Sequence, residues 1–210
     1  MTVNPQSISV RKSAQVISVL FHPLLMTTYL FGILTFYLPS LLLPIRSGLW
    51  LLFLVFLMTF ILPALNFLFF RMSGTIRDLT MVERKDRVLP FAFITILYCA
   101  VTWMFYWKFP VPNLLKVMLI ISFMVIVSAV VTLFYKLSIH AVAVWGVLGI
   151  MLPLNKAVDG ALLYPLSVGI LIAGIVMSSR LFLNVHHPRE VMVGSLVGFL
   201  VGFAGMMMLF

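Results

Sequence analysis

The stretch GLWLLFLVFLMTFILPALNFLFF, residues 48–70, decides the fold class. It runs for twenty-three residues without an ionisable side chain, and Asn66 is its only amide. A helix needs about 20 consecutive apolar residues to cross the hydrocarbon core of a bilayer. Residues 48–70 therefore predict a membrane-spanning helix.

The rest of the chain has the same character. Of 210 residues, 63% are hydrophobic and 9% are charged, whereas an average soluble domain has roughly 25% charged residues. Six further apolar runs occur, at 16–37, 91–107, 114–135, 139–154, 161–178 and 191–210. We therefore expect an all-α transmembrane bundle of six to seven helices, folded as a single integral membrane domain over residues 1–210. This composition excludes an ordinary soluble enzyme, and the expected location is the cell (inner) membrane.

Basic residues are unevenly distributed between the two sides of such a bundle. Seven crossings would place the N-terminus and segments 71–90, 136–139 and 179–190 on one side, called here the N-terminal face. This face holds ten of the 14 Lys and Arg, which the positive-inside rule would assign to the cytoplasm. If five of the ten bind a ligand, however, the faces carry five and four, so the orientation stays open. The basic residues behind the net charge of +9 are thus interpreted as loop residues, headgroup contacts or ligand contacts. We expect no nucleic acid as a partner.

Histidines also gather at the N-terminal face. Three of the four, His140, His186 and His187, lie at the ends of apolar runs there, whereas His22 is expected at the start of the first helix, against lipid headgroups. A charged group at the bilayer centre costs about 2.5–3.5 kcal/mol on insertion scales, so such a gathering predicts a polar cavity. Three segments would form this cavity, namely 83–90, 136–140 and 179–190.

All three segments precede predicted helices, and two of them carry helix-start signals. Ser138 is expected to cap the helix that begins at 139, where free backbone N–H groups and the helix dipole favour an anion. In the segment 179–190, Pro188 suits the first helical position and Glu190 the positive helix end. This structural interpretation leaves the adjacent His186 and His187 unexplained.

The third segment carries a spacing that is specific to a known family. Ser179-Arg180, five residues, His186, three residues and Glu190 resemble the third motif of the type 2 phosphatidic acid phosphatase superfamily, which includes membrane-embedded lipid phosphatases. The turn Ser138-Ile139-His140 is similar to the second motif of that family. The chain departs from the family pattern at Ile139, where glycine is usual, and at Glu190, where aspartate is usual.

The first motif of the family is matched most loosely. Arg87 and Pro90 resemble its end, but Thr80 stands where the family has lysine, and the proline comes three residues late. Arg84 or Lys85 is the replacement cation that we expect.

The resemblance implies a phosphatase that uses neither a metal nor another cofactor. His186 would be the nucleophile that forms a phosphohistidine, Glu190 would fix the tautomer of His186, and His140 would protonate the departing lipid oxygen. His187 is the competing nucleophile, although it lies one place out of the spacing. The expected phosphate ligands are Arg180, Arg87 and Ser138, with Arg84 or Lys85 assisting.

The substrate and the partners follow from the same resemblance. The substrate would be a phospholipid monoester or a polyprenyl pyrophosphate that enters from the bilayer. The alternative is a non-catalytic binder or transporter of an anionic lipid, which would use the same arginines but would not require His186 or His140.

Small residues recur in the last apolar run. Gly194, Gly198 and Gly202 would form one smooth stripe for close helix contact. We expect this stripe to pack against another helix of the same chain, with self-association the less favoured use.

Overall fold

The computed structural model describes residues 5–39, 45–74, 85–108 and 111–210, with side chains placed for 9–39, 48–74, 88–108 and 111–210. Within these ranges the chain is helical and has no strand. Six helical segments are long and apolar enough to cross a membrane, and the bent pair α1–α2 would make a seventh. The all-α bundle of six to seven helices predicted from the sequence is thus confirmed. The elements are α1 (Pro5–Leu20), α2 (Pro23–Tyr37), α3 (Ile45–Phe56), the π-helix η1 (Leu57–Ile61), α4 (Leu62–Met72), α5 (Lys85–Lys108), α6 (Pro112–Phe134), α7 (Ile139–Ala157), α8 (Leu163–Phe182) and α9 (Pro188–Leu209).

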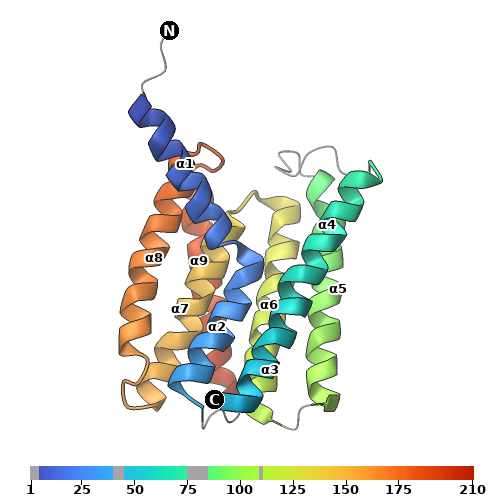
Figure 1. The fold of residues 1–210 in the computed structure, drawn as a ribbon, viewed down its shortest axis with the longest axis vertical. Coiled ribbons are helices and arrows are strands. Elements are labelled where there is room, and N and C mark those ends of the chain that lie inside the picture. Colours follow the sequence, from blue (N-terminus) through green and yellow to red (C-terminus); the bar gives the residue numbers. More distant parts are fainter. Residues whose placement is uncertain (1–4, 40–44, 75–84, 109–110) are drawn as a thin grey trace.

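The helices from α2 to α9 stand side by side as one bundle, and α1 projects beyond it (Figure 1). The ends of α4, α6 and α8 lie at the same end of the bundle as the starts of α5, α7 and α9 (Figure 1). The C-terminus lies at the opposite end (Figure 1). The described parts of segments 71–90, 136–139 and 179–190 therefore lie at one end of the bundle. This is the end that the sequence analysis called the N-terminal face.

The glycine stripe of α9 packs against the backbone of α7. A Cβ atom on Gly194 would lie 2.7 Å from the Ser138 carbonyl oxygen, and one on Gly198 would collide with the Val142 carbonyl oxygen. Such distances leave no room for a side chain. The stripe comprises Gly194, Gly198 and Gly202, and each of them faces a carbonyl oxygen at or in α7. The intrachain packing expected of these glycines is what the structure shows, and it brings the starts of α7 and α9 together.

The structure differs from the predicted helix boundaries at two places that bear on function. The apolar run at 16–37 is not one helix: α1 ends at Leu20, α2 starts at Pro23, and their axes differ by 60°. Proline has no N–H to donate, and its ring clashes with the carbonyl four residues earlier, so it breaks the helix there. Helix α5 begins at Lys85, so the polar segment before Phe91 continues into the helix.

Candidate active site

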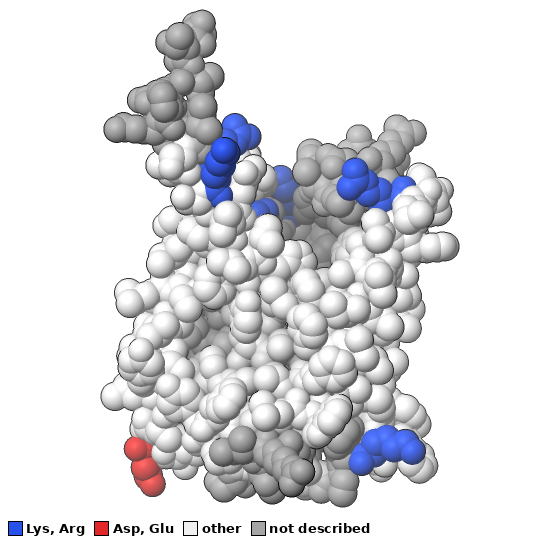
Figure 2. Space-filling model, viewed as in Figure 1, with Lys and Arg blue, Asp and Glu red and all other residues white. Residues whose placement is uncertain are grey.

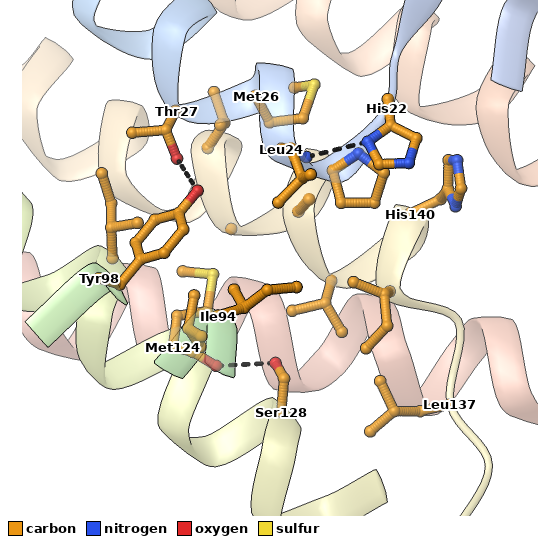
Figure 3. A pocket seen from close by; sticks show the side chains of 18 of the residues that line it. His22, Leu24, Met26, Thr27, Ile94, Tyr98, Met124, Ser128, Leu137 and His140 are labelled. Carbon is orange, nitrogen blue, oxygen red and sulfur yellow. Dashed lines mark hydrogen bonds between the residues drawn. The ribbon is translucent and has the colours of Figure 1, made fainter. Parts of the chain in front are cut away.

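A cavity of about 270 Å³ lies inside the bundle, and its lining includes residues at the N-terminal face. Its walls come from α2, α4, α5, α6 and α7, together with single residues near the starts and ends of other helices. Most lining side chains are apolar, but four are basic or imidazole groups: His22, His140, Arg180 and His186. Figure 3 shows His22 and His140 at one end of the cavity and the hydrogen-bonded hydroxyls of Thr27 and Tyr98 at the other. The cavity therefore has a polar end and a long apolar wall.

His186 and Glu190 form the closest contact between ionisable side chains that the described residues show at this site. His186 Nδ1 lies 2.8 Å from Glu190 Oε2, and the two side chains are 9% and 11% exposed. His186 sits in the turn before α9, and Glu190 in the first turn of that helix. The four-residue spacing noted in the sequence therefore corresponds to a direct contact. The His186 ring projects from the turn before α9 and not from the helix itself.

This contact determines which nitrogen of His186 carries the proton. A carboxylate accepts hydrogen bonds, so Nδ1 is the donor and Nε2 keeps its lone pair. Burial lowers the pKa of His186 below its ordinary value of 6.5, and Arg180 and Lys136 lower it further, while the Glu190 carboxylate opposes the shift. A neutral imidazole with a free Nε2 lone pair is what a nucleophile at neutral pH requires.

Glu190 is held in place by groups from two segments. Its Oε2 accepts a hydrogen bond from the His187 backbone N–H at 3.3 Å and lies 3.8 Å from Lys136 Nζ. The Ser138 backbone N–H donates to the Glu190 carbonyl oxygen at 3.1 Å. These bonds hold the segments 136–140 and 179–190 together. The close approach of Gly194 to Ser138 contributes to the same contact.

His140 projects from the first turn of α7 into the same cavity as His186. Its Nε2 lies 3.0 Å from the carbonyl oxygen of Ser18, at the end of α1. A carbonyl oxygen only accepts, so Nε2 carries a proton, and Nδ1 remains as the ring nitrogen available to a substrate.

Arg180 lines the cavity from the last turn of α8. Its Nε is buried and has no hydrogen-bond partner among the described residues. A buried donor without a partner is costly, and an arginine fork matches phosphate oxygens two at a time. Arg180 is therefore placed to bind an anion in the cavity.

Ser138 occupies the N-cap position of α7, as expected, but its side chain makes no capping hydrogen bond. It does not line the cavity, although its neighbours Leu137 and Ile139 do. Its side chain is fully buried, and the hydroxyl has no partner in the described part of the chain. The Ser138 backbone N–H is already engaged by Glu190.

Some predicted site residues lie outside the described side chains. Arg84 falls in a segment whose placement is not described, and Lys85 and Arg87 lie in the first turn of α5, where only the backbone is described. Their predicted role in phosphate binding stays a prediction. His187, the competing nucleophile, is exposed and is not among the lining residues of the cavity, unlike His186.

Sequence reasoning missed His22. It was expected against headgroups, but it lines the cavity, and its ring centroid lies 5.7 Å from that of His140. The signal was present, because an ionisable residue directly before a proline inside an apolar run marks a helix break. Figure 2 shows further Lys and Arg side chains gathered at the N-terminal end of the molecule.

The comparisons with known proteins point to one family. Residues 134–210, which include α7, α8 and α9, match the family model of the PAP2 superfamily, the type 2 phosphatidic acid phosphatases. No curated protein and no solved structure matches the chain. The matched region contains His140, Arg180, His186 and Glu190. The C-terminal part of the chain is therefore similar to the PAP2 superfamily, and this match is consistent with a phosphatase-type function in an integral membrane protein.

Proposed function

We propose that this protein is a membrane phosphatase that hydrolyses a lipid phosphate monoester or a polyprenyl pyrophosphate through a phosphohistidine on His186. The observation that carries the proposal is the 2.8 Å contact between His186 Nδ1 and Glu190 Oε2, beside a cavity that Arg180 and His140 also line. Binding an anionic lipid needs cations. It does not need an imidazole whose free nitrogen is fixed by a carboxylate.

The cations would bind the phosphoryl group. Arg180 has a buried Nε–H without a partner among the described residues, and its fork would hold two nonbridging oxygens. The unpaired Ser138 hydroxyl would donate a hydrogen bond to a third phosphoryl oxygen after its side chain rotates toward the cavity. Arg87, with Arg84 or Lys85, would complete the clamp from the start of α5. Phosphoryl transfer depends mainly on such positioning and charge balance.

The chemistry would proceed in two steps. The bound phosphate would hold His140 as an imidazolium, with a second proton on Nδ1. His186 Nε2 would attack phosphorus while the bond from phosphorus to the leaving oxygen breaks, and His140 would give its Nδ1 proton to that oxygen. Water would then attack the phosphohistidine, with His140 taking up the proton of the water. The products are phosphate and either the dephosphorylated lipid or, from a pyrophosphate, the lipid monophosphate, and both histidines return to the states they had in the substrate complex.

The cavity supports a lipid as substrate. Beyond the four basic or imidazole residues, its walls are mostly apolar side chains from five helices of the bundle. A phosphate bound at the polar end would place the first carbons of its tail along these walls. The proposed setting is the cell (inner) membrane.

The decisive experiment measures phosphate release by the purified protein in detergent. The substrate panel comprises phosphatidate, phosphatidylglycerophosphate, undecaprenyl pyrophosphate and a lipid A phosphate. We expect His186→Ala to lower kcat at least about 10³-fold, as loss of a nucleophile does, and radiolabelled substrate to leave an acid-labile phosphohistidine on the wild type only. His187→Ala is the matched control, because the neighbouring ring is exposed, and it should keep most of the activity.

Two outcomes would overturn the proposal. Full activity in His186→Ala would show that His186 is not the nucleophile. A wild type that binds the lipids but hydrolyses none of them would favour the alternative, a binder or transporter of an anionic lipid.

A chelator provides a further check on the mechanism. Every group named in the two steps is a protein side chain or water, so we expect phosphate release to persist after treatment with a chelator. A strict requirement for added Mg²⁺ would contradict this mechanism.

A further inference from the structure

The break between α1 and α2 changes which backbone groups are free. In a continuous helix the Val19 carbonyl would accept from residue 23, but Pro23 has no N–H. The His22 N–H donates to the Val19 carbonyl oxygen instead, at 3.2 Å. The Ser18 carbonyl therefore loses the helical partner it would have had, which is that same N–H of His22.

The carbonyl released in this way is the one that His140 uses. His140 Nε2 lies 3.0 Å from the Ser18 oxygen, across 122 positions of the sequence. This bond is the only one between α1 and a cavity-lining imidazole that the described residues show. It fixes the proton of His140 on Nε2 and leaves Nδ1 free.

His22 strengthens the same arrangement from the other side of the break. Its Nδ1 accepts the Leu24 backbone N–H at 3.4 Å, which fixes the ring as the cap of α2. The ring meets that of His140 edge to face, with centroids 5.7 Å apart (Figure 3). The break thus contacts His140 through a hydrogen bond and through ring packing.

We propose that the α1–α2 break is the positioning element for His140. The Ser18 carbonyl holds His140 as its Nε2–H tautomer, so the proton that His140 exchanges with the substrate moves through Nδ1. Ser18 and His22 are positioning residues, and both lie outside the matched residues 134–210. The consequence for activity rests on the acid–base role proposed above for His140, whereas the tautomer itself does not.

Pro23→Ala tests this role through turnover. The alanine would supply the missing N–H to Val19, the His22 N–H would return to the Ser18 carbonyl, and His140 would lose its partner. We expect kcat to fall about 10- to 100-fold with KM unchanged, as on loss of an orienting hydrogen bond. In a His140→Ala background the same change should have no further effect. Ser13→Ala in the same helix is the control, since its hydroxyl is exposed and donates to the Ser9 carbonyl oxygen, so its kcat should stay within about 2-fold of the wild-type value.

A measurement without activity separates this proposal from the proposed function. Side-chain ¹⁵N spectra of histidine-labelled protein, with the His140 signal identified by its loss in His140→Gln, report which nitrogen is protonated. We expect Nε2–H in the wild type and a mixture of tautomers in Pro23→Ala. An Nδ1–H tautomer in the wild type would overturn the proposal even if the protein is an active phosphatase. An inert protein with the Nε2–H tautomer would overturn the proposed function alone.

Discussion

Glu190 is the residue on which most of the site depends. Its Oε2 accepts hydrogen bonds from the His186 ring and the His187 backbone and lies 3.8 Å from Lys136 Nζ. The carboxylate therefore orients the proposed nucleophile and closes the first turn of α9 with the same atom. Its loss would affect both the chemistry and the local fold, and a test must separate the two effects.

Glu190→Gln is expected to lower kcat far more than it raises KM. An amide retains the shape of the carboxylate, but its NH₂ group can donate to His186 Nδ1 and so stabilise the wrong tautomer, a change that costs about 10⁴-fold in serine proteases. Steady-state kinetics on the best lipid of the panel would measure the loss. A matching fall in the unfolding temperature would assign the loss to the fold, and unchanged kinetics would contradict the orienting role.

The pH dependence of kcat/KM follows from the environment of His186. Burial lowers its pKa below 6.5, so the neutral nucleophile persists at pH 6.5, and activity should fall only as the pH drops through the lowered pKa. The acid limb should move further down in Glu190→Gln, because the carboxylate opposes this lowering. The unfolded chain binds the proton more readily than the folded one below pH 6.5, so folding stability should fall there as well. An acid limb above pH 6.5 would show that another group controls the rate.

At the residue scale, the sequence predicted pairs that lie close in the chain better than those that lie far apart. The spacing from His186 to Glu190 led directly to their contact, because four residues across a helix start bring the two side chains together. The role of His22 depended on which helix comes to lie beside the break. No local pattern encodes that His140, 118 positions later, is its neighbour.

At the scale of helices, hydrophobic runs located the elements and proline changed them. Residues 16–37 contain no Lys, Arg, Asp or Glu, so hydropathy alone predicts one continuous helix there. The missing N–H of Pro23 instead divides the run into α1 and α2. Similarly, the glycine stripe of α9 predicted a close helix contact. The stripe did not identify α7 as the partner, because it could have packed against any other helix of the bundle.

The contact between α7 and α9 predicts a contrast between two glycine substitutions. Gly198→Ala would place a Cβ into the Val142 carbonyl, which is backbone and cannot turn away, so we expect a loss of about 1–3 kcal/mol of unfolding free energy. Gly174→Ala in α8 is the control, because no atom lies within 4 Å of its added Cβ. Thermal unfolding in detergent would measure both. Equal stability of the two variants would contradict the packing described here.

At the scale of the whole molecule, the residues proposed for chemistry and much of the cavity wall come from different regions of the chain. The residues proposed for chemistry lie mostly in 134–210, the region that matches the PAP2 superfamily. Much of the cavity wall comes from α2, α4, α5 and α6, which lie before it. The sequence motifs predicted the chemistry of the first region. They carried no information on which helices would enclose the substrate, since any apolar helix can face either lipid or a cavity.

This division predicts that the cavity wall sets lipid preference separately from the chemistry. Ile94 of α5 lines the cavity, whereas Ile96 of the same helix is 68% exposed on the outer surface of the bundle. Ile94→Trp should fill part of the space along the proposed tail path and raise KM for a long-chain lipid phosphate several-fold, a loss of about 1 kcal/mol. It should leave the hydrolysis of a short-chain phosphate unchanged, because the polar end is intact. Ile96→Trp should alter neither substrate, and an equal effect of both variants on both substrates would show that the tail does not lie in this cavity.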